Sequence, residues 1–355
     1  MGATKGIRVN SIQGLRFWAI SLIVASHCGF LRQGGVGNCI FFALSGFLAA
    51  NPFSIDSELQ FLSCKKFAFY YAKRFFRIIP VYWATLLISH FCFNVFDLND
   101  FSSASSLLLN ACFIKCWGPL WFIQQEILFY IVLPILMLVF ALIKTVFKKF
   151  KFNEEGMHLI LVVVICILAF LSNRYLTEDV FYVIGNGGPQ RFRLCFFLIG
   201  MAFSYLLKSL KSHKIPFLFS RCARTFSSVI IFAFLLFTIL SAEPILSHFD
   251  DRYSNHFVGW EYSIQIISVV GCILLLLLIH NDSIASRFLS IPLFNNIGNI
   301  SFIVYLVHPY LLSYFEMDNS FHRFIVVYFI SIAIASIIYR YIEKPIVNWS
   351  NSKFR

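Results

Sequence analysis

The chain has 355 residues, of which 59% are hydrophobic and only 13% are charged, and its mean hydropathy is +0.77. These values exclude a soluble globular domain and predict an integral membrane protein. The net charge of +12 does not indicate nucleic-acid binding, because the basic residues occur in short groups between apolar runs rather than on one folded domain. We therefore expect membrane lipid, and no nucleic acid, around this chain.

Ten apolar runs near the length of a membrane-spanning helix follow one another along the sequence. They cover residues 12–30, 36–50, 78–96, 120–143, 158–173, 193–207, 227–246, 262–279, 297–315 and 324–342. The second and fifth runs are short, so nine or eleven spans remain possible. The sequence predicts an all-α bundle of about ten transmembrane helices, with residues 1–355 forming a single domain.

Lysine and arginine are distributed unevenly among the segments that join these runs. When the N-terminus is placed inside, most of the 29 basic residues fall in cytoplasmic segments. This asymmetry predicts that both termini are cytoplasmic. The longer outer segments are then residues 98–119, 175–192 and 247–261.

The first apolar run contains two residues that are costly in a membrane, Arg16 and His27. They are eleven positions apart, which is almost three helical turns, so both project from one face. The helical rise separates them by roughly 16 Å, so each needs its own partner. A lipid-facing charge costs about 2.5 to 3.5 kcal/mol, which favours a protein interior or a wet cavity. The alternative is that Arg16 reaches the head-group layer and His27 lies in the opposite interface.

A basic cluster precedes the third apolar run in the stretch YYAKRFFRIIPVYW. Arg74 and Arg77 are three residues apart and share a helix face, and Lys73 lies beside them. Because guanidinium groups bind phosphate oxygens in pairs, this cluster is a candidate phosphate site. The alternative is a cytoplasmic anchor of the positive-inside kind.

Two more ionisable residues lie within apolar runs. Glu126 is a little over one turn into the fourth run, where a carboxylate needs a partner or a proton. His308 shares one helix face with Ser301 and Tyr305 in the ninth run. With the two polar residues of the first run, they make four ionisable groups in three apolar helices, which packing alone does not explain.

Several chemistries lack their sequence signatures. The chain contains no HExxH, no GxSxG, no Walker-type glycine loop and no dinucleotide fingerprint, so we expect no metal and no permanently bound cofactor. Ser45, in the stretch FFALSGFL, is interpreted as a small packing residue rather than a nucleophile. The ten cysteines are interpreted as small hydrophobes, except that Cys112 and Cys116 could be linked in an oxidising compartment.

Taken together, these stretches resemble the acyltransferase 3 family of polytopic membrane acyltransferases, many of which O-acetylate bacterial surface polysaccharides. The resemblance rests on the Arg16 and His27 spacing, on FFALSGFL, RFFRIIPVYW, WFIQQEILFY and ISFIVYLVHP, and on a closing Glu-Lys-Pro at 343–345. Each motif is weak alone, but six in order are specific. The chain looks like the stand-alone form of the family, without an added extracytoplasmic esterase-like domain.

The chain departs from the family pattern at two positions. Phe122 stands where the family usually has Ser, and Phe302 stands where it usually has Tyr. We expect neither change to touch a residue that performs chemistry.

The resemblance implies that acetyl-CoA, or a related acyl-CoA, is the co-substrate. It also implies a bacterial inner-membrane protein whose acceptor is a lipid-linked or surface glycan such as an O-antigen or capsule unit. CoA is polyanionic at one end and carries its thioester on a long arm, which suits a basic cluster with a reactive group deeper in the protein. We expect Arg74, Arg77 and Lys73 to bind the acyl-CoA, with Arg16 as a possible further phosphate contact.

The expected catalytic group consists of His27, Arg16, Glu126 and His308. A histidine with a pKa near 6.5 can take a proton from an acceptor hydroxyl at working pH, so His27 is the expected general base near the outer face. Direct attack by that hydroxyl is preferred over an acetyl-histidine relay. Glu126 and His308 would orient or charge-balance His27, or bind the acceptor.

Two other functions remain open from the sequence. A transporter or flippase for a polyprenyl-linked glycan would also place ionisable residues inside the membrane. An acyltransferase that modifies a lipid or a small exported metabolite would use the same chemistry on another acceptor. Dependence on an acyl-CoA donor separates the first alternative from an enzyme, and the acylated product identifies the second.

Overall fold

The computed structural model describes residues 10–55, 63–93, 107–116, 120–151, 154–176, 182–185, 188–213, 220–240 and 263–354. Its helices are α1 (Asn10–His27), α2 (Gly34–Ile55), α4 (Cys64–Phe93), α6 (Trp121–Lys149), α7 (Glu154–Tyr175), α8 (Leu194–His213), α9 (Arg221–Leu240), α12 (Ser263–Ile279), α13 (Ile284–Leu289), α14 (Pro292–Tyr314), α15 (Ser320–Ile338), the π-helical η4 (Tyr339–Glu343) and α16 (Lys344–Lys353). Each of the ten predicted runs overlaps one of these helices.

Five helices in the described part of the chain are long and apolar enough to cross a membrane. They are α6, α7 from Gly156 onward, α9, α14 and the continuous helix of α15, η4 and α16. Shorter apolar helices cover Gly34–Ala50, Leu194–Leu210 and Ser268–Ile279. The helices α1 and α4, which carry Arg16, His27 and the basic cluster, are not in either group because their polar residues lower the hydropathy. The protein is therefore a helical membrane protein, and the number of spans stays a prediction.

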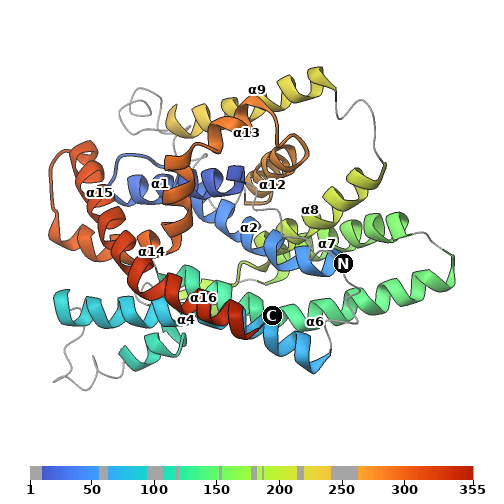
Figure 1. The fold of residues 1–355 in the computed structure, drawn as a ribbon, viewed down its shortest axis with the longest axis horizontal. Helices are drawn as coiled ribbons and strands as arrows, with labels where there is room; N and C mark the ends of the chain where they lie inside the picture. The colour runs from blue at the N-terminus through green and yellow to red at the C-terminus, as the bar shows by residue number, and fades with distance from the viewer. Residues whose placement is uncertain are drawn as a thin grey trace.

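Helix α1 is packed against both α2 and α14, and α2 in turn lies along α8. Figure 1 shows α9 and α13 along one edge of the molecule and α4, α6 and α16 along the opposite edge, with α1, α2 and α8 between them. Arg16 on α1 is thus buried by other helices, as an arginine within an apolar run requires.

Glycines allow these central helices to approach each other closely. A Cβ atom added to Gly46 of α2 would lie 2.0 Å from the carbonyl oxygen of Phe197 on α8. A Cβ atom added to Gly298 of α14 would lie 2.0 Å from the carbonyl oxygen of Gln13 on α1. Small residues let membrane helices pack backbone to backbone, and here they set the spacing of the helices that carry the site.

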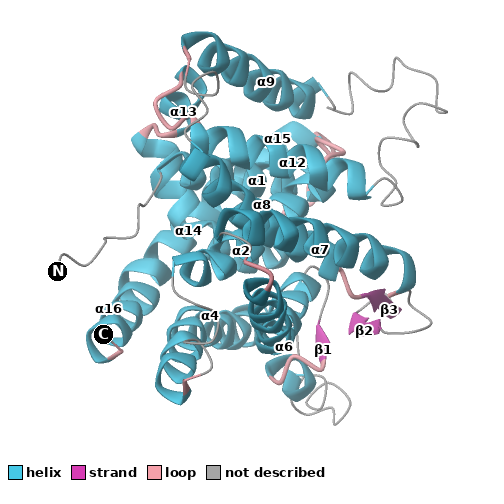
Figure 2. Ribbon diagram, turned by 90° about the vertical axis from the view of Figure 1, so that its right-hand side faces the viewer, coloured by secondary structure: helices cyan, strands magenta, loops and turns pink. Residues whose placement is uncertain are grey.

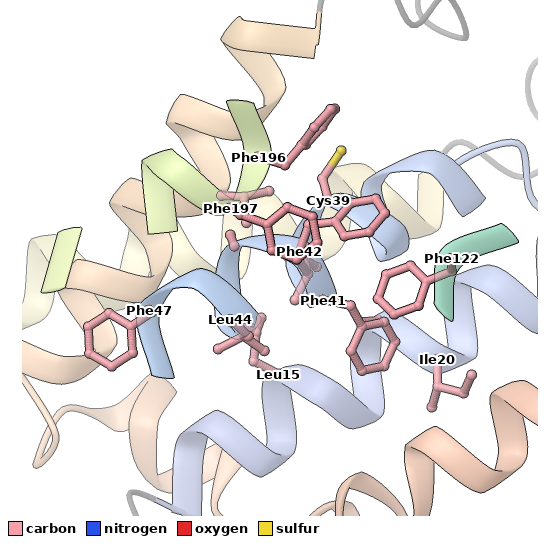
Figure 3. Close-up of a cluster of buried hydrophobic side chains, with 14 of the residues drawn as sticks. Leu15, Ile20, Cys39, Phe41, Phe42, Leu44, Phe47, Phe122, Phe196 and Phe197 are labelled. Carbon is pink, nitrogen blue, oxygen red and sulfur yellow. The ribbon is translucent and has the colours of Figure 1, made fainter. Parts of the chain in front are cut away.

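An aromatic cluster fills the space between α2, α6 and α8 (Figure 3). The ring of Phe42 is fully buried, stacks on Phe122 at 4.4 Å between centroids and lies 4.9 Å from Phe197. Such dense packing holds side chains in single positions. The cluster therefore fixes the wall of α6 that faces α2.

A small sheet was not predicted. Strand β1 (Lys115–Cys116) pairs in parallel with β2 (Tyr182–Gly185), and β2 pairs antiparallel with β3 (Gly188–Arg191). It joins two of the predicted outer segments, and Figure 2 shows it at the edge opposite α16. The prediction of an all-α chain is corrected to this extent, because pairing between distant segments leaves no local periodicity. Near β1, the Cys112 thiol is free and exposed.

Helix α4 begins at Cys64, well before the predicted start at residue 78. The residues between carry the basic cluster, which interrupts the apolar run without interrupting the helix, because lysine and arginine are good helix formers. Arg74 and Arg77 therefore do share a regular helix, as their spacing predicted.

Candidate functional site

Helix α1 ends just after His27 in a glycine turn. Gly29 has a φ of +78°, a left-handed conformation that suits glycine. The N–H of Phe30 donates to the carbonyl of Ala25 at 2.9 Å, and the N–H of Gly29 donates to that of Ser26 at 3.0 Å. This pair of bonds is a Schellman motif. It places His27 in the last helical turn, where its side chain is exposed.

His27 forms a hydrogen-bonded pair with His308 of α14. The distance from His27 Nδ1 to His308 Nε2 is 2.8 Å, and the two ring planes are 10° apart. The ring of His308 is fully buried, and its Nδ1 lies 3.2 Å from the carbonyl oxygen of Val304. The partner that the first helix needed for His27 is thus a second histidine.

The carbonyl of Val304 fixes the tautomers of both neutral rings. A carbonyl only accepts, so His308 Nδ1 carries the proton and His308 Nε2 is left as an acceptor. His27 Nδ1 must then donate to it, and the lone pair of His27 lies on Nε2. No described residue bonds to that nitrogen, so the pair presents one basic nitrogen on an exposed ring.

A separate cavity of about 60 Å³ lies between α1, α2, α4, α6 and α14. Its lining combines charged, hydroxyl and aromatic side chains: Arg16, Phe41, Leu44, Ser45, Leu48, Arg74, Arg77, Ile78, Phe122, Glu126, Tyr130, Phe302 and Tyr305. Three arginines face one glutamate in this set, so the cavity is positively charged and suits an anion.

Glu126 is held in place by two hydroxyl groups. Ser45 Oγ donates to Glu126 Oε1 at 2.9 Å, and the hydroxyl of Tyr130 donates to the same oxygen at 3.0 Å. Arg74 Nη1 then donates to the Tyr130 hydroxyl at 2.7 Å. The network links α2, α6 and α4 through one carboxylate. Ser45, which the sequence suggested as a packing residue, therefore lines the site, and the close packing is made by its neighbour Gly46.

Arg16 lines the same cavity and is only 9% exposed. Its Nη1 donates to Gln13 Oε1 at 3.4 Å, and its charge is within electrostatic range of Glu126 and Glu343. Arg77 is exposed at the cavity and interacts electrostatically with Arg16 and Glu343. No other described residue bonds to Arg77, so its guanidinium is available to a ligand.

Glu343 is a site residue that the sequence did not identify as one. It is 7% exposed and ends the π-helical segment η4, a type of helix that often marks functional sites. Its Oε2 has no hydrogen-bond partner among the described residues. Its position in the closing Glu-Lys-Pro motif could have drawn attention to it. Its proximity to Arg16 of α1 and Arg77 of α4, however, depends on how the last helix packs.

The structure divides the predicted site residues into two groups. Arg16, Arg74, Arg77 and Glu126 meet in the cavity, whereas the two histidines meet toward the C-terminal ends of α1 and α14. Lys73 joins neither group, because it is exposed and does not line the cavity.

Other lining residues went unpredicted. Tyr130 is four residues after Glu126, a spacing that places the two on one helix face and was a usable signal. Phe122 and Phe302 both lie in the cavity wall, so the two departures from the family pattern fall within the lining of the site. Among the described residues, no group of three or more His, Cys, Asp or Glu side chains could hold a metal ion.

Comparison with known proteins gives the family. The chain matches the acyltransferase 3 family, described as an acyltransferase domain, over residues 9–340. It is also 25% identical over 375 aligned residues to the peptidoglycan O-acetyltransferase OatA of Listeria monocytogenes serovar 1/2a. That alignment covers 95% of this chain but only 56% of the relative, and no solved structure matches the chain. Because the family match covers nearly the whole chain, this helical membrane protein belongs to the acyltransferase 3 family.

Proposed function

We propose that this protein transfers an acetyl group from cytoplasmic acetyl-CoA to a hydroxyl of a bacterial surface polysaccharide or its lipid-linked precursor. The family and the peptidoglycan O-acetyltransferase relative support O-acetylation of a polysaccharide. We propose an O-antigen or capsule unit as the acceptor and the bacterial inner membrane as the location, with about ten spans and both termini cytoplasmic. In this topology the sheet and the outer end of α1 face away from the cytoplasm.

The cavity is the proposed donor site. CoA is polyanionic, and three arginines around one glutamate supply the complementary charge. Arg77 is the best placed to bind a phosphate, because it is exposed and has no hydrogen-bond partner among the described residues. Arg74 is already bonded to Tyr130 and the carbonyl of Leu48. Its main role is therefore to position the cavity lining, and it contributes less than Arg77 to phosphate binding. Lys73 has no part in this proposal.

The histidine pair is the proposed catalytic centre. His27 Nε2 takes the proton of the acceptor hydroxyl while the hydroxyl oxygen attacks the thioester carbonyl carbon. The C–S bond of the resulting tetrahedral intermediate then breaks, and the imidazolium returns the proton to the departing CoA thiolate. His308 holds the Nδ1 proton of His27 and so keeps the lone pair on Nε2. The products are an O-acetyl ester and free CoA.

One observation carries this assignment. The chain of bonds from Val304 through His308 to His27 ends in an unoccupied basic nitrogen on an exposed ring. A histidine that only filled space would not need its tautomer fixed by a second, buried histidine. Direct attack uses this nitrogen as a base, whereas an acetyl-histidine relay would use it as a nucleophile.

The test follows label from the donor. Purified protein is incubated with radiolabelled acetyl-CoA and a crude lipid-linked glycan fraction, and label in the glycan is measured. We expect base-labile label in the glycan that requires both protein and donor. If the protein neither binds acetyl-CoA nor moves label to any acceptor, the proposed function is wrong, and transport of a glycan becomes the function to test. Rapid denaturation at neutral pH during turnover distinguishes the two routes, because only the relay leaves label on the protein and an acetyl-imidazole is lost in acid.

A further inference from the structure

Tyr305 lies between the arginine cavity and the histidine pair, and Phe122 packs against it. Phe122 of α6 and Tyr305 of α14 both line the cavity, and their ring centroids are 5.2 Å apart. On its other side, the ring of Tyr305 is 5.6 Å from that of His308. Neither histidine lines the cavity. We call Phe122 and Tyr305 the aromatic partition.

The partition is firmly held. Phe122 is 4% exposed and Tyr305 is 3% exposed. The ring of Phe122 stacks on Phe42 at 4.4 Å and lies edge-on to Phe41 at 5.9 Å (Figure 3). Close-packed aromatic rings of this kind yield little space without displacing their neighbours. A group that moves from the cavity toward the histidines therefore has to pass close to two rings that are held in fixed positions.

We propose that the aromatic partition selects the acyl group by size and restricts the enzyme to short acyl donors. This inference rests on the proposed function, in which the thioester must travel from the cavity to His27. The acyl group is the leading end of the donor and has to pass the partition first. The cavity of about 60 Å³ is small, since one water alone needs roughly 10–15 Å³.

Phe122 is the residue that sets the width. Tyr305 is fixed between the cavity and His308, so its removal would also disturb the catalytic pair. Among the described residues, the ring of Phe122 contacts the rings of Phe41, Phe42, Trp121 and Tyr305 and neither histidine. Its side chain can therefore be shortened without direct loss of a contact to the histidine pair. One methylene in an apolar pocket changes selectivity by about 10- to 200-fold.

The test compares acetyl-CoA, propionyl-CoA and butyryl-CoA as donors for the wild type, Phe122→Leu and Phe122→Ala. The acceptor is the crude lipid-linked glycan fraction, and the readout is the ratio of kcat/KM for butyryl-CoA to that for acetyl-CoA. We expect this ratio to rise about tenfold or more in Phe122→Ala and by a smaller factor in Phe122→Leu.

Phe129→Ala is the matched control. Phe129 is on the same helix and is fully buried against Phe197 at 4.3 Å, but it does not line the cavity. We expect it to lower the amount of folded protein without changing the donor ratio. If Phe122→Ala does not fold, Phe122→Leu carries the test, because it preserves most of the buried volume.

The outcomes separate this inference from the proposed function. If acetyl transfer persists and neither Phe122 variant changes the donor ratio, the partition does not select the acyl group, and the proposed function stands. An equal gain for all three donors also overturns the inference. If the wild type transfers no acyl group and does not bind CoA, both proposals fail.

Discussion

The arginine cavity and the histidine pair share the helices α1 and α14, but their polar groups are partnered very differently. In the cavity, two hydroxyls, from Ser45 and Tyr130, join Glu126 and Arg74 in a network that spans three helices, and Arg77 is left at the exposed side. In the histidine pair, two rings and one backbone carbonyl form a single line of bonds that ends in a lone pair. A site that binds needs many donors held in fixed positions, whereas a site that moves a proton needs one basic nitrogen left open.

This contrast predicts different kinetic consequences for the two regions. Changes in the histidine pair lower kcat, and changes in the cavity lower the affinity for the donor. The variants below test that division, from the largest expected effect to the smallest.

His27→Ala removes the proposed base. We expect kcat for acetyl transfer to fall by about 10³-fold, within the roughly 10²- to 10⁴-fold range of general acid–base catalysis. Single-turnover transfer from labelled acetyl-CoA measures it. His90→Ala is the control, because His90 is a buried histidine of α4 that belongs to neither region. Normal transfer by His27→Ala would remove His27 from the mechanism.

His308→Ala removes the group that holds the His27 tautomer. We expect kcat to fall by about 10²-fold, less than for His27→Ala, because the base itself remains. His308→Gln should recover part of the loss, since its amide oxygen can accept the proton of His27 Nδ1. If alanine and glutamine are equally defective, His308 contributes volume rather than a hydrogen bond.

Arg77→Ala and Lys73→Ala compare two basic residues on one face of α4. Arg77 lines the cavity and Lys73 does not. Loss of one charge-assisted contact of about 1.5 kcal/mol weakens binding about tenfold. Equilibrium binding of CoA should therefore be about tenfold weaker in Arg77→Ala and within about twofold of wild type in Lys73→Ala. Equal effects would mean that the positive charge near the membrane, and not the cavity, attracts the donor.

Ser45→Ala removes one of the two hydroxyls on Glu126. The remaining bond from Tyr130 keeps the carboxylate in place, so we expect only a two- to tenfold rise in the KM for acetyl-CoA, from about 0.5 to 1.5 kcal/mol for one hydrogen bond. Ser301→Ala is the control, because Ser301 is a buried serine of α14 whose hydroxyl bonds only to the Gly298 carbonyl and does not line the cavity. If KM changes by the same factor in both variants, the effect comes from altered helix packing and not from the hydrogen bond to Glu126.

The sequence was most informative where the relevant spacing is local. Apolar runs located the ten helices, and the helical period showed that Arg16 and His27 share a face but need different partners. That expectation is confirmed, because Arg16 lies in the cavity and His27 bonds to His308. The start of α4 was missed because a basic stretch hides helical continuity from a search for apolar runs.

Contacts between distant segments were not predictable from spacing. His308 was identified as an ionisable residue, but its pairing with His27 depends on how closely α1 and α14 approach at Gly298. Ser45 was interpreted as packing because a hydroxyl in an apolar helix usually is, and only the position of Glu126 on another helix reveals its bond. The three-stranded sheet depends on the same kind of long-range pairing.

The central claim is that donor binding and proton transfer reside in different groups of residues. Equilibrium binding of CoA to His27→Ala, measured beside Arg77→Ala and the wild type, tests it most directly. The account predicts that His27→Ala binds CoA within about twofold of the wild type while Arg77→Ala binds about tenfold more weakly. Loss of CoA binding in His27→Ala equal to that in Arg77→Ala would contradict it, because the two regions would then form one binding site.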